Sequence, residues 1–89
     1  MTGATSPAQV RQAIADMIAE ASDGAVAAAD ALAGRHPLSA LGLTSLARIR
    51  LIDAIEDTFA VDLDLESDLS SFEYVDVLAG HLASLLAAR

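Results

Sequence analysis

Residues 41–59 read LGLTSLARIRLIDAIEDTF, and this stretch predicts an amphipathic helix. Thr44 and Ser45 are residue types that cap helices, so the helix is expected to begin at one of them. Apolar side chains then recur every three or four positions and predict a face that packs on a core: Leu46, Ile49, Ile52, Ile55 and Phe59. Leu51 lies off this stripe and indicates a second buried edge. The charged residues of the helix are expected to stay in water: Arg48, Arg50, Asp53, Glu56 and Asp57.

A first helix is expected close to the beginning of the sequence. Ser6 can cap this helix, Pro7 suits its first turn, and Gln9 completes a capping box. Its apolar positions recur at helical spacing and predict one buried stripe: Val10, Ile14, Met17, Ile18 and Ala21. The pair Asp23-Gly24 is expected to end it.

The segments around the central helix predict loops and one more helix. Residues 25–38 are rich in alanine, and we expect a long ordered loop in which any short helical stretch stops before Pro37. Residues 61–69 alternate as a strand does, but no partner strand is predicted, so an extended loop with a short helical turn is expected. Its leucines are expected to anchor this loop on the helices: Leu63, Leu65 and Leu69.

Ser70 and Glu73 form a second capping-box pattern, which predicts the start of a last helix. This helix is expected to present an apolar face: Tyr74, Val75, Leu78, Leu82, Leu85 and Leu86. The elements together predict an all-α fold, a small three- to four-helix bundle with a long loop between helices one and two. A chain of 89 residues suits one domain over residues 1–89, with an ordered bundle over about 6–88 and a flexible tail over 1–5.

Composition excludes several classes of function. The net charge of −8, from thirteen acidic residues against five arginines and no lysine, argues against binding to nucleic acid. Nine of the thirteen acidic residues fall between Asp53 and Asp76, an asymmetry that favours basic surfaces on partner proteins. No run of about 20 apolar residues predicts a membrane span. Cysteine is absent, which excludes disulfides and thiolate sites, and with no signal-peptide pattern we expect a cytoplasmic protein.

The order of these elements resembles an acyl or peptidyl carrier protein over most of the chain. The resemblance is carried by LGLTSLARIRLIDAIEDTF after a long loop, by the acidic DLDL that follows, and by the final YVDVLAGHL. It implies a bundle of the acyl-carrier-protein type and makes Ser45 the attachment point of a 4'-phosphopantetheine arm. A phosphopantetheinyl transferase would install that arm from coenzyme A, and its terminal thiol would carry the substrate as a thioester. The protein would then be a carrier and would perform no catalysis itself.

The residues near Ser45 suit a phosphodiester. A negative charge at a helix start is favoured by the unpaired amides and the helix dipole, by about 0.3–1 kcal/mol when exposed. Gly42 permits a turn beside the hydroxyl, and Leu46 offers an apolar contact to the installing enzyme. The alternative is that Thr44 or Ser45 merely caps the helix and that Gly42 merely turns the loop.

The chain also departs from the carrier patterns. Fatty-acid carriers usually have an aspartate before the modified serine and acidic residues after it, whereas these places hold Thr44, Ala47, Arg48 and Arg50. Peptidyl carriers often have an arginine where Arg50 lies, but generally have a Gly-Gly pair where this chain reads Leu-Gly-Leu. We therefore expect a stand-alone, monomeric carrier in a specialised pathway of polyketide or nonribosomal peptide type. Its partners would be an acyl- or aminoacyl-loading enzyme and a ketosynthase or condensation-type enzyme, and the cargo stays open.

A rival interpretation is an acidic helical interaction module without a prosthetic group, with or without calcium. Five acidic residues fall at positions 1, 3, 5, 7 and 12 of an EF-hand loop: Asp62, Asp64, Glu66, Asp68 and Glu73. Ser67 occupies the position where that loop needs glycine, and no partner loop is present. His36 and His81 are far apart in sequence and have ordinary surface roles, so no metal site is expected. No base for Ser45 and no Gly-x-Ser-x-Gly motif are evident, which argues against an enzyme.

Overall fold

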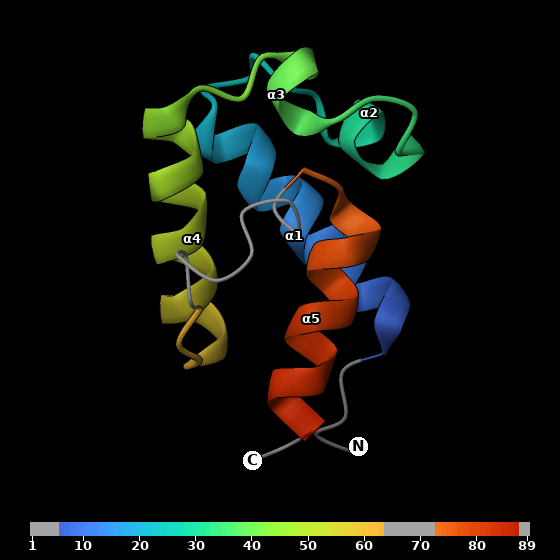
Figure 1. The fold of residues 1–89 in the computed structure, drawn as a ribbon, viewed down its shortest axis with the longest axis vertical. Helices are drawn as coiled ribbons and strands as arrows, with labels where there is room; N and C mark the ends of the chain where they lie inside the picture. Colours follow the sequence, from blue (N-terminus) through green and yellow to red (C-terminus); the bar gives the residue numbers. More distant parts are fainter. Residues whose placement is uncertain (1–5, 64–72, 88–89) are drawn as a thin grey trace.

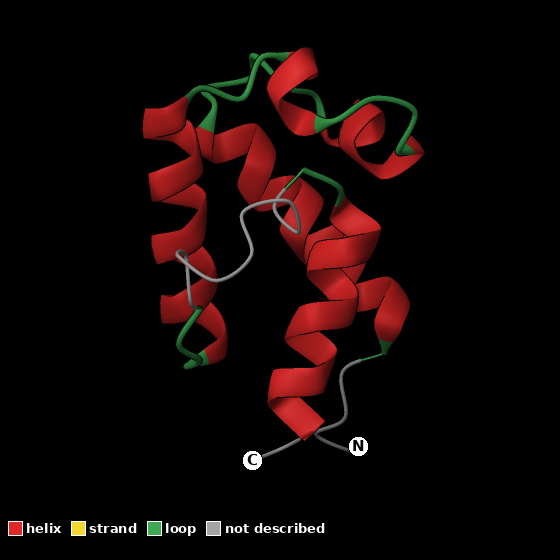
Figure 2. Ribbon diagram, in the orientation of Figure 1, coloured by secondary structure: helices red, strands yellow, loops and turns green. Residues whose placement is uncertain are grey.

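The computed structural model describes residues 6–63 and 73–87, and within these ranges the secondary structure consists of helices joined by loops and turns, without strands (Figure 2). The described helices are α1 (Pro7–Ala21), α2 (Ala28–Ala33), α3 (Leu38–Leu41), α4 (Ser45–Phe59) and α5 (Val75–Ala87). The all-α prediction is therefore confirmed. None of these helices combines the length and the apolar composition that a membrane span requires.

Helix α1 is the centre of the bundle. It contacts α2, α4 and α5, and Figure 1 shows α4 and α5 on its two sides with the short α2 and α3 across one end. Ile14, Ala15 and Ile18 of α1 are completely buried, as is Leu51 of α4. The core thus lies along α1, and the face of α4 that turns away from α1 remains available at the surface.

The ends of α1 follow the predicted signals. The Ser6 hydroxyl accepts a hydrogen bond from the Gln9 amide, and the Gln9 side chain accepts one from the Ser6 amide, so the capping box is complete. Ser22 caps the C-terminus, after which Asp23 and Gly24 adopt positive φ angles of 54° and 83°. The Asp-Gly pair therefore ends the helix as expected.

The segment between α1 and α4 holds more structure than a loop. Two short helices, α2 and α3, form within it, although the sequence analysis allowed only one short helical stretch before Pro37. Helix α2 ends at Gly34, whose φ of 64° is left-handed, and Pro37 caps the start of α3. The segment packs on the core through four buried side chains, each 4% exposed or less: Val26, Ala31, Leu38 and Leu43.

The predicted apolar stripe of α4 is wrong at its first two positions. Leu46 is 58% exposed and Ile49 is 54% exposed, whereas the buried residues of the helix are Ala47, Leu51, Ile52 and Ile55. At 3.6 residues per turn, each three-residue step falls about 60° short of a full turn, so three such steps carry the pattern to the opposite side of the helix. Leu51 therefore lies at the centre of the buried face rather than on a second edge.

Two charged residues of α4 are also less exposed than predicted. Arg48 and Glu56 are both half-buried, while Arg50, Asp53 and Asp57 are exposed as expected. The Glu56 carboxylate accepts a hydrogen bond from the Leu63 amide at 2.8 Å. Leu63 is itself buried, so Glu56 helps to fix the chain after α4, where Leu63 anchors it as predicted.

Helix α5 begins later than the capping-box prediction requires. Its first residue is Val75, so Glu73 precedes the helix and does not occupy the third helical position. Val75, Leu78, Ala79 and Leu82 are buried, and Leu85 and Leu86 are partly buried against the core. Tyr74 is 37% exposed and is not part of the buried face. Ser70, Leu65 and Leu69 lie outside the described residues.

Candidate functional site

Ser45 is the first residue of α4, and its side chain is exposed. The chain reaches it through a tight turn at Gly42, which has a φ of 117°, a value that L-residues rarely adopt. The Gly42 amide bonds to the carbonyls of α3, and the Leu43 amide donates to the Leu38 carbonyl at 3.0 Å. Leu43 is also buried. The chain just before Thr44 is therefore fixed by backbone hydrogen bonds at Gly42 and Leu43 and by the packing of the Leu43 side chain.

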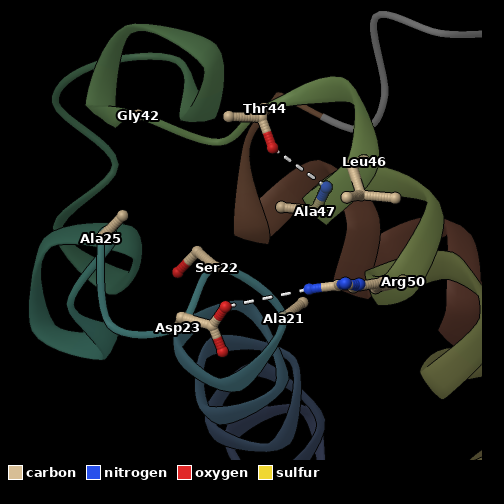
Figure 3. A pocket seen from close by; sticks show the side chains of 9 residues that line it. All are labelled: Ala21, Ser22, Asp23, Ala25, Gly42, Thr44, Leu46, Ala47 and Arg50. Atoms are coloured by element: carbon tan, nitrogen blue, oxygen red, sulfur yellow. Dashed lines mark hydrogen bonds and ion pairs between the residues drawn. The ribbon is translucent and has the colours of Figure 1, made fainter.

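Thr44, and not Ser45, caps α4. The Thr44 Oγ1 accepts a hydrogen bond from the Ala47 amide at 3.1 Å (Figure 3), and the Thr44 carbonyl accepts one from the Arg48 amide at 2.9 Å. The Ser45 hydroxyl makes no hydrogen bond with any residue in 6–63 or 73–87. The threonine therefore holds the helix end, and the Ser45 hydroxyl is exposed and takes no part in the cap.

A surface pocket of about 240 Å³ adjoins this helix start (Figure 3). Its lining comes from the end of α1, the loop after it, the turn between α3 and α4, and the first half of α4: Ala21, Ser22, Asp23, Ala25, Gly42, Thr44, Leu46, Ala47 and Arg50. Arg50 Nη1 and Asp23 Oδ2 face each other across it at 3.8 Å. Both side chains are largely exposed, so this ion pair contributes little stability.

Two large apolar side chains lie exposed close to Ser45. Leu46 is the next residue, and Ile49 lies one helical turn below Ser45, where residues four apart are neighbours on the helix surface. The apolar spacing of α4 predicts both in the core, so neither is predicted as a surface residue from that pattern; Leu46 is predicted only as an apolar contact for the installing enzyme. A helical wheel centred on Leu51 instead of Ile52 could have found them.

Arg48 is directed into a small polar cluster instead of into solvent. Its Nη2 donates to Glu73 Oε1 at 2.7 Å, and its Nε is buried without a hydrogen-bond partner among the described residues. Ser39 of α3 completes the cluster, because its hydroxyl donates to Glu73 Oε2 at 2.6 Å and its amide to Oε1 at 3.2 Å. The Ser39 hydroxyl, and after it the Ser39 amide and Arg48, lower the pKa of Glu73 against the opposing effect of burial.

The other candidate residues do not come together in the described structure. Asp62 is exposed, and Glu73 is occupied by Ser39 and Arg48, while Asp64, Glu66 and Asp68 lie outside the described residues. Within residues 6–63 and 73–87 no group of three or more acidic or histidine side chains could hold a metal ion. His36 and His81 are both exposed.

The geometry leaves an accessible primary hydroxyl at a helix start, beside exposed apolar side chains. A comparison with known protein families matches residues 8–82 to the phosphopantetheine attachment site. This match spans Ser45, the pocket and the Arg48–Glu73 cluster. No curated protein and no solved structure matches the chain significantly.

Proposed function

The chain belongs to the phosphopantetheine attachment site family, and we propose that Ser45 is the residue that accepts the 4'-phosphopantetheine arm. Proteins of this family carry the arm covalently and serve as carriers, not as catalysts. When bound, the arm supplies a flexible tether and a terminal thiol that holds acyl groups as thioesters. The residues of the chain have to present one hydroxyl, accommodate a phosphodiester next to it and offer a surface to enzymes.

The observation that carries this proposal is the free hydroxyl of Ser45. An α-helix leaves its first four amides without intrahelical partners, and at this end the Thr44 side chain accepts from only one of them, that of Ala47, while the Arg48 amide makes the first regular helical bond to the Thr44 carbonyl. The amides of Ser45 and Leu46 remain, with no acceptor among the described residues. A phosphodiester on Ser45 would lie beside these two amides and the positive end of the α4 dipole. The residues present therefore fit the group.

Partner enzymes would dock on the exposed face of α4. Leu46 and Ile49 form its apolar part next to Ser45, Arg50 adds one cation, and Asp53 with Asp57 makes its far end acidic. A phosphopantetheinyl transferase and biosynthetic enzymes are the partners that the family implies. Arg48 was expected on this face with Arg50, but its contact with Glu73 removes it from the docking surface.

We further propose a specialised pathway of polyketide or nonribosomal peptide type. Thr44 stands where fatty-acid carriers usually have aspartate, and Arg50 gives the upper part of the exposed face a positive charge. A partner evolved for acidic residues at these positions would meet like charge at Arg50, which disfavours it. The loading enzyme and a ketosynthase or condensation-type enzyme would instead offer an acidic or polar group there.

The test is arm attachment followed by intact mass. The purified apo protein is incubated with coenzyme A and a phosphopantetheinyl transferase of broad specificity. We expect the wild type to gain the mass of one phosphopantetheinyl group, Ser45→Ala to gain none, and Ser84→Ala to behave as the wild type. Ser84 is a matched control because it is an exposed helical serine whose hydroxyl bonds only locally, to the Gly80 carbonyl. Attachment to the Ser45→Ala protein would overturn the assignment.

A further inference from the structure

We propose that Thr44 is a positioning residue for arm attachment: by capping α4 it keeps the hydroxyl of the next residue, Ser45, free for modification. The inference rests on the proposed function of Ser45 and deepens it. Thr44 and Ser45 both carry a hydroxyl, but only one of them can cap the helix at a time. Thr44 caps it, and Ser45 accepts the arm.

The geometry at Thr44 is that of a complete cap. Its φ of −75° and ψ of 168° are extended, its Oγ1 accepts from the Ala47 amide at 3.1 Å, and its carbonyl accepts from the Arg48 amide at 2.9 Å. Ser45 consequently has helical backbone angles as the first residue of α4. Its hydroxyl makes no hydrogen bond that holds the helix end. An attacking nucleophile needs an oxygen that is unengaged in this way.

Ser45 could cap the helix if Thr44 did not. Serine is at least as good a cap as threonine, so the sequence contains two competent caps side by side. In the alternative register Ser45 would become extended, and its Oγ would accept from the Ala47 or Arg48 amide. That hydrogen bond would occupy an oxygen lone pair and turn the hydroxyl toward the helix axis. The two registers thus differ in whether the oxygen that must attack is available.

The chain before Thr44 is held in place up to its entry into α4. Gly42 turns with a φ of 117°, and Leu43 is only 4% exposed with its amide bonded to the Leu38 carbonyl. These contacts fix where the chain enters α4, but they do not decide which hydroxyl accepts from the first turn. That choice depends on the Thr44 Oγ1 itself.

The test compares the loss of this cap with the loss of another. Thr44→Ala removes the α4 cap, and Ser6→Ala removes the equivalent α1 cap, in which the Ser6 hydroxyl accepts from the Gln9 amide at 3.2 Å. Both substitutions should lower the melting temperature by a similar amount. Only Thr44→Ala should also slow the initial rate of arm attachment with coenzyme A and transferase, by at least about five-fold, because about four fifths or more of the population should then cap with Ser45.

Conservative variants and an NMR measurement distinguish an effect of Thr44 on the Ser45 hydroxyl from an effect on the stability of the fold. Thr44→Ser and Thr44→Asp retain a side-chain acceptor and should restore the rate to within about two-fold of the wild type. The ¹³Cα and ¹³Cβ shifts of Ser45 in the apo protein should be helical in the wild type and move toward extended values in Thr44→Ala. If that variant does not fold, Thr44→Gly, which lacks the side-chain acceptor but is tolerated as a cap, should show both effects to a smaller extent.

The outcomes distinguish this inference from the proposed function. If Thr44→Ala and Thr44→Gly accept the arm as fast as the wild type, or if the Ser45 shifts stay helical in both, the positioning role is wrong while Ser45 can still be the attachment site. If the wild type takes no arm, or if Ser45→Ala takes one, the proposed function itself fails.

Discussion

Arg48 of α4 and Glu73, which precedes α5, form an ion pair with 2.7 Å between Nη2 and Oε1. The side chains are only 23% and 25% exposed, and Ser39 of α3 donates two further hydrogen bonds to the same carboxylate. The Glu73 carbonyl also accepts from the Leu38 amide at 2.8 Å. This cluster therefore ties three segments of the chain together one turn below Ser45.

The two arginines of α4 should differ in their effect on stability. Arg48→Gln should lower the free energy of unfolding by about 1–3 kcal/mol, because it breaks a half-buried charged hydrogen bond. Arg50→Gln is the matched control and should change it by less than about 0.5 kcal/mol, since its pair with Asp23 is exposed. Urea unfolding followed by circular dichroism measures both values. Equal effects would mean that the Arg48–Glu73 pair stabilises the fold no more than the exposed Arg50–Asp23 pair does.

Glu73 should make the protein sensitive to acid. Its pKa lies below the ordinary value of 4.5, so the native state binds the proton less readily than the unfolded chain does. The stabilisation is complete above that ordinary value and is lost as the pH falls through the lowered pKa. The difference in stability between the wild type and Glu73→Gln should therefore shrink as the pH is lowered below 4.5. Thermal melts from pH 7 downward check this, and a constant difference would argue against a lowered pKa.

The corrected face of α4 predicts which leucine matters for folding. Leu51 is completely buried, so Leu51→Ala should cost about 2–5 kcal/mol, and Ile52→Ala a similar amount. Leu46 is 58% exposed, and Leu46→Ala should cost less than about 0.5 kcal/mol. A chain of this size has a stability of only about 5–15 kcal/mol, so the first change is severe. A neutral Leu51→Ala in a denaturant titration would contradict the described core.

The exposed apolar residues of α4 should matter for partner enzymes instead. Ile49→Ser should slow arm attachment at low transferase concentration and leave the melting temperature almost unchanged. Val77→Ser is the control, because Val77 of α5 is 47% exposed and thus similar to Ile49 at 54%. We expect the control to accept the arm at the wild-type rate. Equal rates for both variants would place the docking surface elsewhere.

Much of the fold could be predicted because local signals coincide with the tertiary structure. The capping box at Ser6 and the Asp-Gly stop define α1 without reference to any other element. The cap at Thr44 and the turn at Gly42 likewise locate the start of α4, and with it the candidate serine. Such signals act within a few residues, so one sequence is enough to read them.

The errors arise where distant segments decide the outcome. Arg48 is half-buried because Glu73 lies opposite it, and nothing near position 48 in the sequence indicates that partner. Glu73 was assigned to a helix cap because it lies three residues after Ser70, whereas Ser39 and Arg48 engage its carboxylate. The error in the α4 stripe has a local cause instead, because the three-residue steps from Leu46 to Ile55 resemble one face but rotate around the helix.

Locating the arm on the chain is the most direct test of Ser45 as the attachment residue. Protein loaded from coenzyme A is digested, and the modified peptide is fragmented in a mass spectrometer to assign the phosphopantetheinyl group to a residue. We expect modification at Ser45 alone, with the neighbouring Thr44 and the α3 residue Ser39 unmodified, because of these three exposed hydroxyls only that of Ser45 has no partner among the described residues. An arm found on Thr44, on Ser39 or on no residue of this chain would contradict it.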